Sequence, residues 1–234
     1  MADPRTEEIA ANLHEVRERI AEACRDAGRD PDEVTLVVVT KTWPADDVVR
    51  LAGLGVRDVG ENKDQEASPK AVATEGLGLT WHFIGQLQTN KAASVARYAD
   101  VVHSVDRVEL VTALEKGAAK ADRTVDCLVQ VSLDPHAPPG RGGAHATEVA
   151  QVAAAIADAP HLRLRGVMGV APLGADPAPA FAILADALAS LRATYRGLDV
   201  MSAGMSDDLE QAVAAGATHL RVGSSILGSR APRG

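Results

Sequence analysis

The sequence predicts an α/β protein, a single-domain (β/α)8 TIM barrel preceded by one extra helix. Short apolar runs alternate with helical patterns along the chain, and about eight such units follow Val34, the number that closes a parallel barrel. The length of 234 residues lies near the short end of the range of about 200 to 400 residues for this architecture. Aromatic residues make up only 3% of the chain, so the core must be aliphatic, as in helices packed on a sheet.

Charge and cysteine content narrow the class of protein. The formal net charge of −8 is spread along the chain and argues against nucleic acid as the main partner, because a phosphate backbone calls for a basic face. Cys24 and Cys127 fall inside predicted elements and form no C-x-x-C pair, which argues against a disulfide framework and a structural metal. The N-terminus lacks the pattern of a signal peptide, and no apolar stretch approaches the ~20 residues that span a bilayer. We therefore expect a cytoplasmic protein without membrane contact.

The extra helix is predicted over residues 5–27 and the barrel over residues 34–228. Ile9, Leu13, Val16 and Ile20 recur at helical spacing in the first segment. The run 34–40 is continuous and mostly β-branched, which is typical of a strand buried on both faces. Further strands are predicted at 56–60, 81–85, 101–104, 125–133, 163–170, 200–203 and 218–223, and helices at 45–54, 107–121, 146–157, 178–195 and 207–215.

Two sequence features bear on the barrel and its mouth. No G-x-G-x-x-G motif follows the first strand, so an open dinucleotide-binding sheet has no support. The Pro/Gly-rich stretch 134–143 directly follows the fifth strand, which in a barrel places it at the carboxyl-terminal face, where catalytic loops lie. We interpret this stretch as an active-site loop rather than a domain boundary.

Lys41 is the first candidate for chemistry. It ends the first buried strand, and Pro44 then starts a helix, so its side chain is expected at the barrel mouth. A partly desolvated amine there could attack an aldehyde. A solvated rim lysine is the alternative, since lysine is usually exposed.

Small and hydroxyl residues follow the predicted seventh and eighth strands, in the stretches 202–208 and 221–225. Phosphate sites of barrels often lie there, where backbone N–H groups and a helix N-terminus face an anion. Ser206 and Ser224 are the candidate ligands, although capping of the helix that begins at Asp207 would also explain Ser206.

Polar residues also follow or interrupt the second and third strands. Asn62 comes after a strand, where an amide caps a helix or touches a ligand. His82 alternates with Trp81 and Phe83 and is expected to point into the barrel, where a histidine is more often a hydrogen-bonded core residue than a catalytic one.

Six motifs in order resemble the pyridoxal phosphate homeostasis protein family, a group of short alanine-racemase-like barrels. They are Val39-Thr-Lys-Thr42, Gly60-Glu-Asn62 with Gln65-Glu66, Trp81-His-Phe-Ile-Gly-x-Leu-Gln-x-Asn-Lys91, Leu164-Arg-Gly-Val-Met168, Ser202-Ala-Gly-Met-Ser-Asp-Asp208 and Arg221-Val-Gly223. The resemblance extends from about Val34 to Gly228 and departs from the usual pattern at Lys63, Ala203 and the loop 140–143.

The resemblance implies a fold-type III barrel that holds pyridoxal 5′-phosphate (PLP) as an imine, or Schiff base, on Lys41. It implies that the phosphate rests on Ser206 and the Gly223-Ser224 turn and that Arg221 faces the pyridine nitrogen. It also implies that the pocket is lined by Asn62, His82, Met168 and Ser202.

An arginine facing the ring nitrogen would only weakly assist carbanion formation, because its own proton is hardly removable. The chain ends soon after Gly228, which leaves no room for the β-domain that in racemases supplies a tyrosine base, and Tyr98 and Tyr195 fall late in helical stretches. We therefore expect a monomeric protein that binds PLP and delivers it, with no catalytic residues and with PLP-dependent apo-enzymes as candidate recipients, in vitamin B6 homeostasis. The alternatives are a minimal fold-type III enzyme that racemises amino acids slowly, and a barrel that binds another phosphate compound through Ser206 and Ser224.

Overall fold

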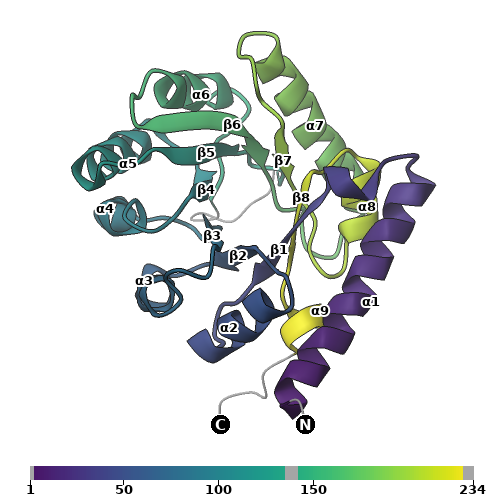
Figure 1. The fold of residues 1–234 in the computed structure, drawn as a ribbon. Helices are drawn as coiled ribbons and strands as arrows, with labels where there is room; N and C mark the ends of the chain where they lie inside the picture. The colour runs from purple at the N-terminus through teal and green to yellow at the C-terminus, as the bar shows by residue number, and fades with distance from the viewer. Residues whose placement is uncertain (1–2, 135–141, 229–234) are drawn as a thin grey trace.

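The computed structural model describes residues 3–134 and 142–228 and contains a closed barrel of eight parallel strands (Figure 1). Each strand pairs with the next, and β1 pairs with β8 in the register Val38↔Val222. The predicted (β/α)8 architecture is therefore confirmed. None of the helices in these ranges has both the length and the hydropathy needed to cross a bilayer.

The strands are β1 (Thr35–Val39), β2 (Asp58–Glu61), β3 (Thr80–Phe83), β4 (Val101–Val105), β5 (Val125–Gln130), β6 (Leu162–Met168), β7 (Val200–Ser202) and β8 (His219–Val222). The helices are α1 (Pro4–Asp26), α2 (Ala45–Gly53), α3 (Asp64–Ala73), α4 (Ala92–Val95), α5 (Val108–Ala121), α6 (Val149–Ala157), α7 (Ala178–Arg192), α8 (Leu209–Ala214) and α9 (Ser224–Leu227). Short 3-10 turns precede β1 and α4.

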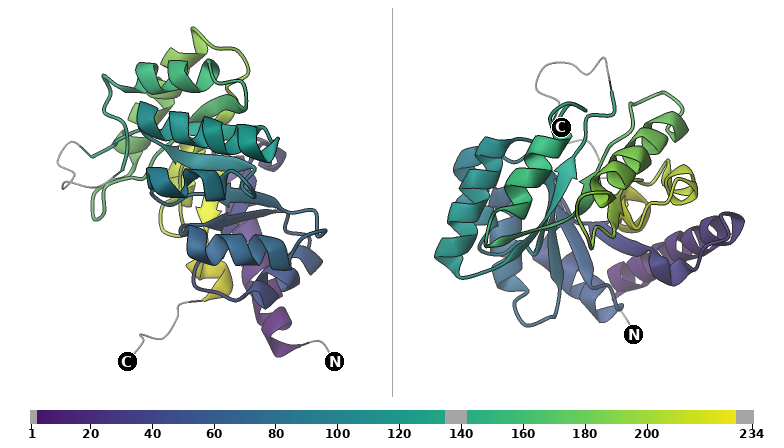
Figure 2. Two further views of the ribbon diagram at one scale, coloured as in Figure 1. Left: turned by 90° about the vertical axis from the view of Figure 1, so that its left-hand side faces the viewer. Right: turned by 90° about the horizontal axis from the view of Figure 1, so that it is seen from above.

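The helix α1 is the extra N-terminal helix that the sequence predicts. Asp3 caps it by accepting a hydrogen bond from the backbone N–H of Arg5, and Pro4 occupies the first turn, where its missing N–H costs nothing. Its apolar face is buried against α8 and α9, so the helix lies outside the ring (Figures 1 and 2). The Asn12 amide, which donates to the carbonyl oxygen of Ile226, fixes α1 across the end of the chain.

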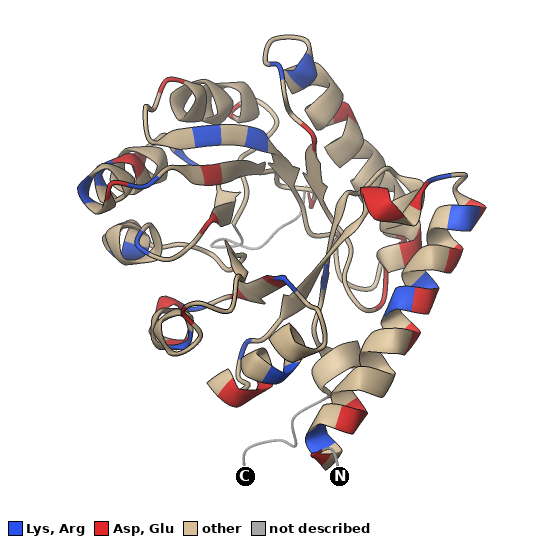
Figure 3. Cartoon of the chain, viewed as in Figure 1, with Lys and Arg blue, Asp and Glu red and all other residues tan. Residues whose placement is uncertain are grey.

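The continuous β-branched run of β1 is buried because helices cover the outside of the barrel and side chains fill its inside. Val37 and Val38 are fully buried, and the largest apolar cluster includes buried residues of α1, α2 and each helix from α4 to α9. Charged residues gather on the helices and loops, while most of the strand surface is uncharged (Figure 3). The exceptions include Arg163 and Arg165 on β6, which pair with Asp126 of β5.

The structure corrects several predicted boundaries. The helices α3 and α4 were not predicted, and α3 carries no apolar stripe because Asp64 and Lys70 are among its buried residues. The helix α8 begins at Leu209, not at Asp207, and β5 ends at Gln130, not at residue 133. Of the predicted loop 134–143, residues 135–141 lie outside the described part of the chain.

Gly166 allows β6 and β7 to approach each other closely. Its φ is +153°, and a Cβ at this position would lie 1.8 Å from the carbonyl oxygen of Val200. We expect Gly166→Ala to lower the free energy of unfolding by about 2 to 4 kcal/mol, because the barrel would have to open locally. Gly53→Ala is the control, since nothing surrounds that site, and it should leave stability unchanged or raise it by up to about 1 kcal/mol. Urea unfolding measures both, and equal effects would contradict the prediction.

Candidate functional site

The candidate residues converge on the carboxyl-terminal ends of the strands. Lys41 comes two residues after β1, Asn62 follows β2, and Met168 and Ser202 end β6 and β7. Because all strands are parallel, these ends meet at one rim of the barrel. Closure of the barrel brings the β1 and β8 loops together, and a Cβ on Gly223 would lie only 3.0 Å from the carbonyl oxygen of Val39.

Lys41 has an exposed side chain and a fixed backbone. Thr40, before it, is fully buried, and Thr42, after it, adopts a left-handed conformation with φ of 69°. The backbone N–H of Thr42 donates to the Glu66 carboxylate at 2.8 Å, and the carbonyl oxygen of Thr40 accepts from Lys70 Nζ at 2.8 Å. The structure therefore holds the chain on both sides of Lys41, while the Lys41 side chain itself is exposed.

A buried ion pair between β2 and α3 is the basis of this support. Lys70 Nζ lies 2.5 Å from Glu61 Oε1, and the hydroxyl of Thr40 donates to the same oxygen at 2.7 Å. Glu61 is fully buried, and its other oxygen has no hydrogen-bond partner among the described residues. Removing either partner would leave an isolated charge in an apolar surrounding, which is costly.

Tyr98 is a half-buried residue close to Glu61 and Asp64. Burial raises the pKa of its phenol, and Asp64 and Glu61 raise the pKa further, so the group stays protonated. Its ring packs edge-on against Trp81 at 6.4 Å.

Two hydroxyl groups from consecutive loops meet at the rim. Ser206 Oγ and Ser224 Oγ are 3.2 Å apart, and Arg19 of α1 donates to the backbone oxygen of Ser206 at 3.1 Å. Ser224 is the first residue of α9, where backbone N–H groups have no intrahelical partner. The capping alternative for Ser206 is wrong, because α8 begins at Leu209 with Asp208 at the N-cap position.

The donors at this point fit a phosphate group. Two hydroxyls and the amide groups of the α9 N-terminus are available, and Gly223 keeps the adjacent position free of a side chain. Gly204, two residues before Ser206, has φ of +87°, and a Cβ there would lie 2.6 Å from Ala212. The loop after β7 can therefore take this path only with glycine at that position.

Arg221 is a buried cation on β8. It is 5% exposed, and it donates to Ser202 Oγ at 2.6 Å and to the carbonyl oxygen of Gly169 at 2.9 Å. Burial lowers the pKa of its guanidinium to about 10, while the Asp208 carboxylate acts in the opposite direction. The group is thus still charged at neutral pH, and part of its five-donor fork is left for a further acceptor.

His82 lies inside the barrel, as its alternation with aromatic residues predicts. Its Nδ1 is 2.8 Å from His103 Nε2 and its Nε2 is 3.0 Å from Asp58 Oδ1, at the amino-terminal end of β2. His103 in turn contacts Ser202 Oγ through Nδ1 at 2.9 Å. His82 is therefore separated from Arg221 by two side chains, and its direct contact with a ligand at the rim stays a prediction.

The sequence reasoning missed His103. It is fully buried in the apolar strand β4, and a buried histidine in an apolar run requires a hydrogen-bond partner. That rule was the available signal.

Met168 packs with Leu128 and Val200, and the backbone of Asn62 lies so close to Gly85 that a Cβ there would be 2.1 Å from the Asn62 oxygen.

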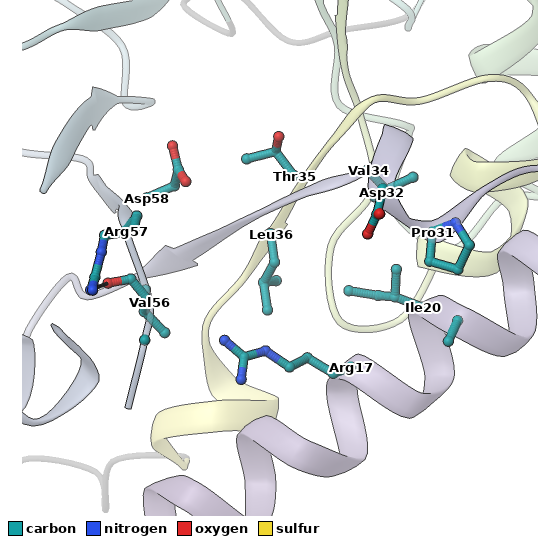
Figure 4. Close-up of a pocket in the computed structure, with 12 residues that line it drawn as sticks. Arg17, Ile20, Pro31, Asp32, Val34, Thr35, Leu36, Val56, Arg57 and Asp58 are labelled. Atoms are coloured by element: carbon teal, nitrogen blue, oxygen red, sulfur yellow. Dashed lines mark hydrogen bonds between the residues drawn. The ribbon is translucent and has the colours of Figure 1, made fainter. Parts of the chain in front are cut away.

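The described cavities include two at the opposite end of the barrel. One of about 480 Å³ lies between α1 and the amino-terminal ends of β1 and β2, with Arg17, Ile20 and Asp58 in its wall (Figure 4). Another of about 530 Å³ is lined by His82, Asp58 and the first residues of several strands. The candidate ligand residues Lys41, Ser206 and Ser224 border neither cavity.

The fold places this chain in a known class of barrel proteins. Residues 6–231 match the family model of the alanine racemase N-terminal domain. The alanine racemase of Streptomyces coelicolor A3(2) has the same fold, with a TM-score of 0.73 at 16% identity, and the match covers 96% of this chain and 59% of that one.

Closer relatives narrow the class to one family. The chain is 38% identical to the pyridoxal phosphate homeostasis protein of Escherichia coli K12 over 229 residues, covering 95% of this chain and 97% of that protein. It is 43% identical to the protein of that name from Corynebacterium glutamicum over 219 residues, with 91% and 97% covered. PipY of Synechococcus elongatus, solved with PLP bound, matches with a TM-score of 0.80 at 33% identity over 94% of this chain and all of PipY. The chain belongs to the pyridoxal phosphate homeostasis protein family.

We expect Lys70→Met to lower the free energy of unfolding by about 3 to 5 kcal/mol, because Glu61 would remain buried without its partner. Urea unfolding at neutral pH measures the change. Lys116→Met is the matched control, since Lys116 is exposed on α5, and it should change stability by less than about 0.5 kcal/mol. A loss no larger than that of the control would show that the ion pair does not stabilise the fold.

Stability should fall as the pH is lowered from 7.5 to 5. Burial keeps the pKa of His103 well below its usual value and lowers the pKa of His219 to about 4, and nearby His82 adds to both effects. Near pH 6.5 these histidines therefore bind protons in the unfolded chain but not in the folded barrel. Each histidine lowers the free energy of unfolding by up to about 1.4 kcal/mol per pH unit.

Urea unfolding across this pH range measures the slope. His219→Asn should make it shallower by up to one proton, whereas His14→Gln, on the exposed face of α1, is the control and should leave it unchanged. A wild-type stability that does not depend on pH in this interval would rule the effect out.

Proposed function

We propose that this chain holds PLP as an imine on Lys41 and takes part in intracellular PLP homeostasis. The observation that carries the proposal is the arrangement at the rim. An exposed amine on a fixed backbone stands in the loop after β1, next to the β8 loop that carries one of two paired hydroxyls. PLP supplies an aldehyde for the amine and a phosphate for the hydroxyls.

Each residue has a distinct role in this proposal. Lys41 provides the nucleophilic amine, and Ser206 with Ser224 and the Gly223 turn donates to the phosphate. Arg221, already held by Ser202 and Gly169, donates to the ring nitrogen with its remaining N–H groups. Asn62, Met168 and Ser202 line the pocket, and His82 supports it from the barrel interior.

The relatives support PLP as the ligand. PipY was solved with PLP bound, and the proteins from Escherichia coli and Corynebacterium glutamicum bear the name pyridoxal phosphate homeostasis protein. The chemistry at the rim favours holding the cofactor over turning over substrates. An arginine at the ring nitrogen leaves it unprotonated, which weakens the ring as an electron sink.

The protein would work in the cytoplasm as a monomer and release PLP to PLP-dependent apo-enzymes. A slow amino-acid racemase with the same cofactor site is the rival function. Incubation with single amino-acid enantiomers in deuterated water separates the two, because racemisation places solvent deuterium on the Cα carbon. Turnover at the rates of ordinary enzymes would contradict a holding role.

The test of the site is borohydride reduction after incubation with PLP. Wild-type protein should gain visible absorbance and one reduced adduct on the peptide that contains Lys41, and Lys41→Ala should lose both. Lys63→Ala is the matched control, because Lys63 is a second exposed lysine that follows a strand on the same rim, and it should keep the adduct. An adduct that persists in Lys41→Ala, or a colourless wild-type protein that still binds phosphate compounds, would refute the proposal.

A further inference from the structure

A row of hydrogen-bonded side chains runs through the barrel from Arg221 to its amino-terminal end. Arg221 contacts Ser202 at 2.6 Å, Ser202 contacts His103 at 2.9 Å, His103 contacts His82 at 2.8 Å, and His82 contacts Asp58 at 3.0 Å. The members come from β8, β7, β4, β3 and β2, so the row crosses the barrel interior. The function proposed above gives roles to Arg221, Ser202 and His82, and none to His103 or Asp58.

The two ends of the row fix its direction. A guanidinium only donates, so Ser202 Oγ must accept from Arg221, and an ionised Asp58 carboxylate only accepts, so His82 must donate to it through Nε2. A neutral His82 then accepts at Nδ1, which places the His103 proton on Nε2 and leaves His103 Nδ1 to accept the hydroxyl proton of Ser202. Every donor therefore points from Arg221 toward Asp58.

This direction matters because Arg221 is a buried cation that makes no ion pair within the described residues, although Asp208 is close enough to act on its pKa. Its contacts in the described chain are the Ser202 hydroxyl and the Gly169 carbonyl oxygen, and both are neutral. With the direction derived above, each imidazole turns its lone pair toward the cation, so the dipoles of both rings stabilise the positive charge. The reverse direction would turn N–H groups toward it and destabilise that charge.

The far end of the row is accessible to solvent. The Asp58 side chain is 26% exposed and borders the cavity of about 530 Å³ at the amino-terminal end of the barrel. His219, Arg165 and Asp199 line the same cavity, and Asp199 is bound to Arg165 rather than to a histidine. The His82 and His219 rings lie 6.1 Å apart, so His219 is beside the row without belonging to it.

We infer that Asp58 is a positioning residue for Arg221 and acts through fixed tautomers of His82 and His103 across the barrel. The carboxylate at one end orients both rings, and the rings hold the Ser202 hydroxyl in the state that accepts from Arg221. The structural part of the inference stands without a ligand. Its consequence for PLP rests on the function proposed above.

Nitrogen-15 NMR of histidine-labelled protein, with no ligand added, tests the row. In the wild type, the proton between the two rings should reside on His103 Nε2, and the His82 proton should reside on Nε2, facing Asp58. In Asp58→Asn neither ring should be held in a single tautomer, because an amide can donate as well as accept. Asp199→Asn is the control, since Asp199 borders the same cavity but contacts Arg165, and it should leave both tautomers as they are.

The outcomes decide each part separately. Protons on Nδ1 in the wild type would overturn the proposed direction of the row, and this result does not depend on whether the variant folds. Unchanged tautomers in a folded Asp58→Asn protein would also overturn the inference. Spectral titration should then show PLP binding weakened roughly three- to tenfold by Asp58→Asn, restored by Asp58→Glu and unaffected by Asp199→Asn. Altered tautomers with unaltered PLP affinity would overturn the link to Arg221. If the wild type binds no PLP at all, the proposed function fails and the row stands.

Discussion

The pairing of β1 with β8 is the constraint on which the site depends. These strands are far apart in the sequence, and their register, Val38 opposite Val222, closes the sheet into a barrel. Closure places the loop that carries Lys41 against the loop that carries Gly223 and Ser224. The exposed Lys41 and the hydroxyl of Ser224, which pairs with Ser206, stand on neighbouring loops because the first strand meets the last. The outer helix α1 lies against α8 and α9, the helices on either side of β8 in the sequence.

Buried polar groups, rather than apolar packing alone, hold the functional side chains. On one side of the rim the pair of Glu61 and Lys70 fixes the chain before Lys41. On the other side Ser202 and Gly169 hold Arg221. A half-satisfied polar group inside a protein is costly, so such networks tolerate few alternative conformations. The barrel therefore supports its carboxyl-terminal rim with two separate polar networks, one between β2 and α3 and one that joins β7 and β8.

The sequence predicted the parts of the structure that repeat and missed those that depend on tertiary contacts. The apolar run 34–40 and the alternation of strands and helices were sufficient for the barrel, because burial on both faces leaves a direct mark on composition. The helix α3 was missed because its buried face includes Asp64 and Lys70, whose partners come from elsewhere in the fold. His103 was missed for the same reason, since its partners His82 and Ser202 are distant in the sequence. The contact between Ser206 and Ser224 was foreseeable because both residues follow neighbouring strands. The later start of α8, at Leu209, was not foreseeable from the sequence.

The left-handed backbone of Thr42, whose N–H donates to Glu66, affects the entropy cost of ligand binding at Lys41. The backbone around Lys41 is already ordered in the folded protein. A ligand that binds to Lys41 therefore has to immobilise little more than one lysine side chain. That entropy amounts to about 2 kcal/mol, far less than closing a disordered loop would require. Binding of a ligand to Lys41 would therefore require no large rearrangement of the backbone from Thr40 to Thr42.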